Sequence, residues 1–152
     1  MSLTIRPMTE ADYPACAREL TAAFREAPWN ETWTYEQAHD RISEIMSARV
    51  SRGIVCMDGE TCVSMLCGRI MTYQDRKMLW IDEFSVHPDW QRQGVGSRML
   101  AFLRQELQKE PRPIHHMALI TTRGFPSVAC YEKNGFVSQM DELVMAGLVT
   151  PT

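Results

Sequence analysis

The stretch Gln91-Arg92-Gln93-Gly94-Val95-Gly96 carries most of the information about the fold of this chain. It follows an apolar, strand-like segment that ends at Val86, and it runs directly into an amphipathic helical pattern that ends before Pro111. Glycines at such a junction let the backbone turn with its amide N–H groups pointing outward, at the positive end of the helix dipole. The stretch therefore predicts a binding site for a phosphate or pyrophosphate group.

Two common nucleotide-binding patterns do not fit these residues. A P-loop requires Lys-Ser or Lys-Thr after its second glycine, whereas Ser97 and Arg98 follow Gly96. A dinucleotide fingerprint requires a third small residue where Met99 stands, within a βαβ unit of parallel strands. The anion site is therefore of another kind.

The strand that leads into this loop changes its apolar face part-way along. Leu79 and Ile81 lie in one alternating phase, whereas Phe84 and Val86 lie in the other. A change of parity requires one extra residue, so we predict a β-bulge near Asp82-Glu83. Bulges redirect side chains and separate neighbouring strands, often beside active sites.

Spacing and capping patterns predict the remaining elements. Thr9 with Asp12 and Thr34 with Gln37 have the form of capping boxes, which start two amphipathic helices. Strands are predicted at 3–6, 54–57, 62–73, 78–86 and 116–121, further helices at 95–107 and 126–133, and one or two last strands within 136–149. We expect one α+β domain over residues 1–152, with a mostly antiparallel sheet and helices over it.

Composition excludes several classes of protein. The 152 residues include 16 Lys+Arg and 19 Asp+Glu, and the formal net charge is −3. The basic residues are scattered, so no nucleic-acid partner is expected. No apolar run reaches the roughly 18 to 20 residues of a membrane span, and the first seven residues lack the apolar region of a signal peptide. We therefore expect a cytoplasmic protein without a membrane partner.

The cysteines and histidines do not form a metal-binding pattern. The five cysteines are an odd number without a C-x-x-C pair, which is typical of reduced thiols. His115 and His116 are adjacent on a predicted strand and would point to opposite faces. No metal site is expected.

A second block of sequence completes a family resemblance. The segment Ala129-Cys130-Tyr131-Glu132-Lys133-Asn134-Gly135-Phe136 follows the first block, whose form is Gln/Arg-x-x-Gly-x-Gly/Ala. Together with the order of the elements, the two blocks resemble the GNAT superfamily of acetyl-CoA-dependent N-acetyltransferases. The resemblance implies a mixed, mostly antiparallel sheet of six to seven strands, about four helices, and a bulged central strand that splays from its neighbour.

The resemblance also implies how acetyl-CoA is bound. Its pyrophosphate should lie on the backbone amides of Gln91, Arg92, Gln93, Gly94, Val95 and Gly96, with added charge from the Arg92 side chain. Its pantetheine arm should bind the backbone of Phe84, Ser85 and Val86. Gly124 stands where the family often has Asn, so main-chain groups or Ser127 would replace the contacts of that side chain.

Acetyl transfer to an amine requires a proton acceptor and a proton donor. An amine with a pKa of about 10.4 is mostly protonated near neutral pH, so an acceptor assists the reaction. Glu83, at the predicted bulge, is the first candidate, acting directly or through water, and His87 is a second. Tyr131 corresponds to the family's general acid, which protonates the thiolate of coenzyme A. A thiol acyl-enzyme at Cys130 is the alternative to direct attack.

The loop between the first two helices is the candidate acceptor site. It offers Trp29, Asn30, Glu31 and Trp33, and aromatic faces beside a carboxylate suit a cation or an amino sugar. A hydrophobic lid or a dimer contact is the alternative reading of the two tryptophans.

The sequence thus predicts acetylation of a primary amine on a small molecule. The alternatives are a protein N-terminus or lysine as acceptor, and a catalytically weak acyl-CoA-binding sensor. Family members often form homodimers, and the apolar segment 143–149 would supply an interface or close the sheet.

Overall fold

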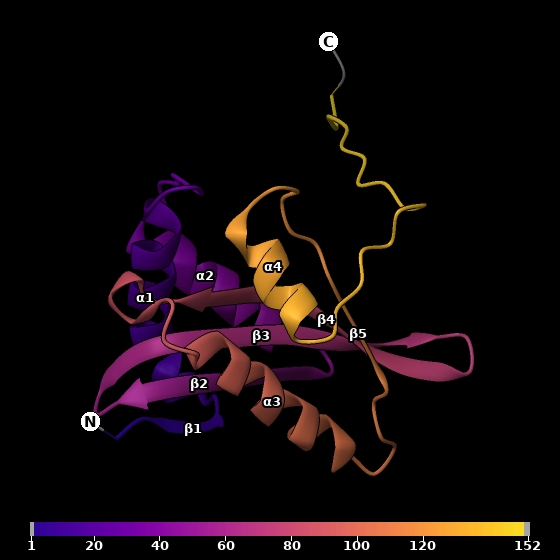
Figure 1. Ribbon diagram of the computed structural model, residues 1–152, viewed down its shortest axis with the longest axis horizontal. Helices are drawn as coiled ribbons and strands as arrows, with labels where there is room; N and C mark the ends of the chain where they lie inside the picture. Colours follow the sequence, from indigo (N-terminus) through magenta and orange to yellow (C-terminus); the bar gives the residue numbers. More distant parts are fainter. Residues whose placement is uncertain (1, 151–152) are drawn as a thin grey trace.

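The computed structural model describes residues 2–150 as a five-stranded sheet with helices on both faces (Figure 1). The strands are β1 (Thr4–Pro7), β2 (Ser51–Asp58), β3 (Thr61–Tyr73), β4 (Arg76–Val86) and β5 (His116–Leu119). The helices are α1 (Tyr13–Arg25), α2 (Tyr35–Met46), α3 (Val95–Gln108) and α4 (Pro126–Lys133), with short 3-10 turns at Glu10–Asp12 and Pro88–Trp90. The strand order is β1-β2-β3-β4-β5, and neighbours are antiparallel except β4 and β5, which are parallel. The α+β class and the mixed, mostly antiparallel sheet are therefore confirmed.

The sheet separates two apolar cores because successive strand residues point to opposite faces. Val55 and Met65 are fully buried against the face that α1 and α2 cover. Their sequence neighbours Ile54 and Leu66 lie in the other core, which α3 covers and which α4 borders through Tyr131. Figure 1 shows the same three layers, with α3 in front of the sheet.

The predicted bulge lies at Asp82. Cys67 of β3 pairs with Glu83 of β4, but the next residue, Gly68, pairs with Ile81, so Asp82 is the extra residue. A Cβ at Gly68 would lie 2.0 Å from the Trp80 carbonyl oxygen, and only glycine permits this approach. Because of this extra residue, Leu79 and Ile81 before the bulge and Phe84 and Val86 after it all point into the core under α3.

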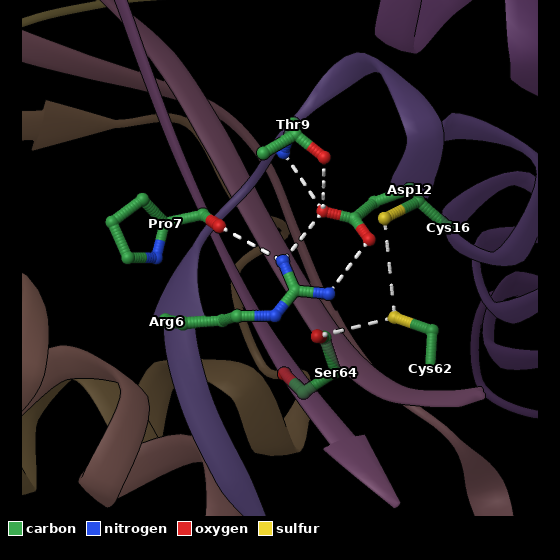
Figure 2. A network of polar contacts seen from close by, with 7 residues as sticks. All are labelled: Arg6, Pro7, Thr9, Asp12, Cys16, Cys62 and Ser64. Atoms are coloured by element: carbon green, nitrogen blue, oxygen red, sulfur yellow. Dashed lines mark hydrogen bonds and ion pairs between the residues drawn. The ribbon is translucent and has the colours of Figure 1, made fainter. Parts of the chain in front are cut away.

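An ion pair and a cap fix the start of α1. Arg6 donates to both carboxylate oxygens of Asp12 at 2.8 Å, and the Thr9 backbone N–H donates to the same carboxylate at 2.8 Å (Figure 2). The hydrogen bond from Arg6 holds the pKa of Asp12 at about 2, below its ordinary value of 3.8. At α2 the predicted capping box is also present, since Gln37 N–H donates to Thr34 Oγ1 at 3.1 Å and Gln37 Oε1 accepts from Thr34 N–H at 3.0 Å.

We expect Asp12→Asn to lower the free energy of unfolding by about 1–2 kcal/mol near neutral pH. The pKa of Asp12 is lower in the folded protein, so its contribution is present above its unfolded pKa of 3.8 and is lost as pH falls through about 2. Urea unfolding of both proteins between pH 2 and 7 measures this difference. A destabilisation that does not shrink at acid pH would contradict the assignment.

The prediction of last strands within 136–149 is wrong. The described residues after α4 form no strand, and their chain runs away from the sheet (Figure 1). The apolar side chains there are largely exposed: Val137, Met140, Leu143, Val144, Met145, Leu148 and Val149. An apolar pattern alone predicts a strand, but a strand also requires a hydrogen-bonding partner, which this segment does not have among residues 2–150. The sheet of the described residues therefore has five strands rather than six to seven.

Candidate active site

One cavity of about 730 Å³ brings together parts of the chain that are distant in sequence. Helix α1 and the loop after it, the end of β4, the loop before α3, the segment after β5 and helix α4 all contribute to its walls. The residues that line it include Phe24, Trp29, Glu31, Trp33, Glu83, Phe84, Ser85, Val86, Gln91, Arg92, Gly94, Val95, Gly96, Thr121, Ser127, Cys130 and Tyr131.

The cavity lies where β5 separates from β4. The last pair in their parallel ladder is Ile81 with Leu119, so β5 ends earlier than the predicted 116–121 segment. On the other edge of β4, the His87 N–H donates to Val63 O at 2.8 Å. In an antiparallel pair, alternate residues hydrogen-bond to the partner strand. Because His87 bonds to β3, the backbone N–H and C=O groups of Phe84 and Val86 point away from β3, toward the gap. A ligand lying in the gap can therefore hydrogen-bond to β4 as a strand would.

The loop before α3 has the backbone of an anion cradle. Arg92 and Gly94 have left-handed φ values of 62° and 81°, and Gly94 is the N-cap residue directly before α3. A Cβ at Gly94 would meet no atom within 4 Å, so the space beside it is open. The Gln91 side chain donates to Val86 O at 2.9 Å and ties the loop to β4. The first-turn amides of α3, which have no partner within the helix, follow directly after this loop and are available to an anion.

Not every residue of the glycine-containing loop reaches the cavity. The Gln93 amide donates to Asp89 O at 3.1 Å, and Gln93 is not among the lining residues. Gly96 is placed by packing, because its Cβ position lies 3.6 Å from both Cys130 Sγ and the Phe84 ring. The small residue at 96 therefore lets α3 approach β4 and α4 closely.

Glu83 is half-buried on the cavity wall, directly after the bulge. Its Oε1 accepts from Arg41 Nε of α2 at 3.0 Å. Burial raises the pKa of Glu83, while the charge of Arg41 opposes that rise and the carboxylate of Glu31 adds to it. A carboxyl with a raised pKa is better suited to accept a proton from an ammonium group near neutral pH. Asp82, by contrast, is bound by Arg69 at 2.7 and 2.8 Å.

Tyr131 stands on α4 and lines the same cavity as the end of β4. Its ring packs between Phe84 and Phe136, at centroid distances of 6.1 and 5.4 Å. Burial raises the pKa of Tyr131, with further contributions from Cys130 and Glu83, so the phenol stays protonated at neutral pH. The side chain is therefore a fixed O–H donor on the cavity wall.

The loop between α1 and α2 forms the aromatic side of the cavity. The Trp29 ring lies edge-on to Phe24 at 5.3 Å and to Phe125 at 4.8 Å, which joins this loop to the start of α4. Trp33 Nε1 donates to Glu31 Oε1 at 2.9 Å.

The fourth predicted acceptor residue lies elsewhere. Asn30 is exposed, has a φ of 51°, and donates weakly to Pro28 O at 3.4 Å. It does not line the cavity, because the turn directs it to solvent. We therefore exclude Asn30 from the candidate acceptor site.

The alternative catalytic residues are less well placed. His87 Nδ1 accepts from Asp89 N–H at 3.1 Å, and His87 does not line the cavity. Cys130 does line it, but burial raises the pKa of its thiol, and no histidine lies among the described lining residues. Without a base, this thiol is a poor nucleophile. Ser127 also lines the cavity, with its Oγ 2.8 Å from Thr121 Oγ1.

Comparison with known families identifies this arrangement. A model of the Acetyltransferase (GNAT) family matches residues 14–136, a range that includes the glycine-containing loop, Glu83 and Tyr131. The chain belongs to the GNAT acetyltransferase family. It is therefore an acyltransferase, and the family uses acetyl-CoA as co-substrate. The open side of the Gly94 loop and the uncovered edge of β4 fit that molecule.

Solved structures share the GNAT fold over nearly the whole chain. A transcriptional regulator from Bacillus halodurans C-125 is 24% identical, with a TM-score of 0.76 and coverage of 96% of this chain and 100% of its own. A possible acetyltransferase from Clostridium difficile 630 is 14% identical, with a TM-score of 0.80 and coverage of 99% and 100%. An aminoglycoside acetyltransferase from an uncultured soil metagenomic sample, in complex with sisomicin, is 16% identical, with a TM-score of 0.71 and coverage of 99% and 97%. At these identities the likeness concerns the fold alone.

Other comparisons give no further assignment. No curated protein matches the chain significantly. Within residues 2–150, no three or more His, Cys, Asp or Glu side chains gather closely enough to hold a metal ion. Within the same range, no helix has the length and apolar character needed to cross a membrane.

Proposed function

We propose that this GNAT enzyme transfers an acetyl group from acetyl-CoA to a primary amine on a small molecule by direct attack. The observation that carries the proposal is the single cavity that Glu83, Tyr131, the edge of β4 and the Gly94 loop line together. Acetyl-CoA supplies the acetyl group as a reactive thioester. Glu83 takes the amine proton, directly or through water, as the N–C bond forms. Tyr131 gives its proton to the sulfur as the C–S bond breaks.

The backbone supplies most of the proposed acetyl-CoA contacts. The amides at Gly94, Val95 and Gly96, with the Arg92 side chain, would hold the pyrophosphate. The strand edge at Phe84 and Val86 would bind the pantetheine arm. Ser127 lines the cavity near the point where the family's frequent Asn is replaced by Gly124, which supports it as the substitute contact.

The acceptor proposed for this site carries a second positive charge. The Glu31 carboxylate accepts a hydrogen bond from Trp33 Nε1 at 2.9 Å, and it lines the cavity together with Trp29 and Trp33. A carboxylate and aromatic rings that line the same cavity both attract an ammonium group. A second amine of the same molecule would then lie toward Glu83. Polyamines and aminoglycosides have this chemistry, and the aminoglycoside acetyltransferases of the same fold support including the latter in a screen.

We expect Glu31→Gln to raise KM for a diamine by about tenfold, because the variant loses one charge-assisted contact. The KM for acetyl-CoA should stay unchanged. Steady-state kinetics with a diamine and with a monoamine of similar length measure the difference, and the monoamine serves as the control. Equal changes for both acceptors would remove Glu31 from the recognition of a second charge.

The overall proposal is tested in two steps. Coenzyme A should first raise the melting temperature of the protein. Thiol release from acetyl-CoA is then measured across polyamines, aminoglycosides, amino acids and peptides. Turnover with peptides alone would favour the alternative acceptor, a protein N-terminus or lysine. Stabilisation without turnover on any amine would favour an acyl-CoA-binding sensor and overturn the enzyme mechanism.

The exposed segment after α4 supports a proposal of a homodimer. The run 143–149 is apolar throughout and its large side chains are exposed, a surface that monomers rarely present. Light scattering after size exclusion would give the mass in solution, and a monomer at micromolar concentration would contradict the dimer.

The five free thiols support a cytoplasmic location.

A further inference from the structure

Glu19 is a buried carboxyl group that the proposed mechanism does not use. It lies on α1 with 2% of its surface exposed, and its Oε2 accepts from Ser85 Oγ at 2.6 Å. Its other oxygen, Oε1, has no hydrogen-bond partner. Among residues 2–150, Glu19 Oε1 is the one buried side-chain oxygen or nitrogen atom without a hydrogen-bond partner. Buried polar atoms are nearly always satisfied, so the exception requires an explanation.

Stability does not explain Glu19. The titratable groups that face it are the Cys62 thiol of β3 and Glu83 of β4, and Arg41 of α2 is bonded to Glu83 instead. Burial raises the pKa of Glu19 well above its ordinary 4.5, because the buried environment disfavours the ionised carboxylate. The folded protein therefore holds the proton of Glu19 more tightly than the unfolded chain does, and the contribution of Glu19 to stability falls as pH rises above 4.5.

The partner of Glu19 belongs to the active site. Ser85 follows Glu83 by two residues on β4, lines the cavity, and is buried. Its carbonyl accepts from Ser64 Oγ of β3 at 2.7 Å, while its hydroxyl donates to Glu19. Ser85 is therefore held on two sides, between the two residues whose backbone groups face the gap left by β5.

We propose that Glu19 is a positioning residue for acetyl transfer, which acts through its hydrogen bond to Ser85. The bond fixes the segment of β4 that carries Glu83 and presents the backbone of Phe84 and Val86 to acetyl-CoA. A carboxyl group that costs stability at this place is consistent with selection for activity rather than for packing. The inference rests on the acyltransferase activity and on acetyl-CoA binding, and it does not depend on which amine is the acceptor.

Two substitutions separate positioning from packing. Glu19→Gln keeps the shape and the hydrogen bond but cannot ionise, whereas Glu19→Leu fills a similar volume without the bond. We expect Glu19→Leu to weaken coenzyme A binding and to lower kcat/KM for acetyl-CoA, each by about tenfold, although its melting temperature is not reduced. Glu19→Gln should retain both values within about threefold, and its stability relative to the wild type should increase as pH rises above 4.5.

Calorimetric titration with coenzyme A and kinetics with acetyl-CoA measure these effects. Ser85→Ala should reproduce the losses of Glu19→Leu, and the double variant should show no further loss. Wild-type affinity and kinetics in a folded Glu19→Leu protein would overturn the proposal. If that variant fails to fold, Ser85→Ala decides in its place, and wild-type behaviour there would overturn it equally. Coenzyme A affinity is measurable without an acceptor, so the result is independent of the acceptor screen.

Discussion

Gly94→Asp is expected to abolish the thermal stabilisation of this protein by coenzyme A. Gly94 has a left-handed φ of 81°, and a Cβ added there would meet no protein atom within 4 Å. The new side chain would therefore project into the open space beside the first turn of α3. The carboxylate introduced at position 94 would exclude the proposed pyrophosphate from that space by its volume and its negative charge. The same carboxylate would also bind the backbone amides that favour an anion.

A matched glycine provides the control for this substitution. Gly59, in the turn between β2 and β3, also has a positive φ of 60° and open space around it, so Gly59→Asp carries a similar backbone strain. It does not line the cavity, and coenzyme A should stabilise this variant as it stabilises the wild type. Differential scanning fluorimetry with increasing coenzyme A compares the three proteins. Normal stabilisation of Gly94→Asp would show that the pyrophosphate lies elsewhere.

Tyr131→Phe is expected to lower kcat by more than about tenfold with little change in coenzyme A affinity. The substitution removes the phenolic O–H but keeps the ring that packs between Phe84 and Phe136. The loss should therefore appear in the step that protonates the sulfur and not in binding. An unchanged kcat would remove Tyr131 from the mechanism, provided that chemistry limits the rate.

Two measurements make the Tyr131 result specific. Tyr73→Phe removes an exposed hydroxyl at the end of β3, where Tyr73 pairs with Arg76 at the opposite end of the β3–β4 hairpin from Glu83, and should leave the kinetics unchanged. Burst or single-turnover experiments establish whether chemistry or product release limits kcat. Because burial raises the pKa of Tyr131 above its ordinary 10, loss of its proton should not reduce the wild-type rate below pH 10.

Sequence patterns predicted correctly those parts of the fold that depend only on residues close together in the sequence. The change of parity between Ile81 and Phe84 predicted a bulge, and Asp82 is the extra residue. Both capping boxes are present because they require only residues three positions apart. The loop from Gln91 to Gly96 turns into α3 as its glycines require.

Local rules failed where an element depends on a partner. The segment 136–149 is apolar enough for a strand, but its chain runs away from the sheet and pairs with no strand among the described residues. Asn30 lies in the expected loop, yet a backbone turn directs it away from the cavity. Neither outcome follows from hydrophobic pattern, because both depend on the path of the chain in space.

The sequence by itself indicated the family, the order of the elements as far as α4, the anion-binding loop, and Glu83 and Tyr131 as candidates. The loop, the caps and the bulge follow from short-range spacing, which backbone geometry translates directly into structure, whereas the role of Tyr131 and part of the case for Glu83 came from the resemblance to the GNAT family. Only the tertiary structure decided that Arg41 pairs with Glu83, that Glu19 lies behind Ser85, and that the Trp29 loop meets α4. No spacing connects these residues in the chain. They meet because α1 and α2 pack on one face of the sheet while β5 and α4 border the gap beside β4, and the pKa of each buried group depends on those neighbours.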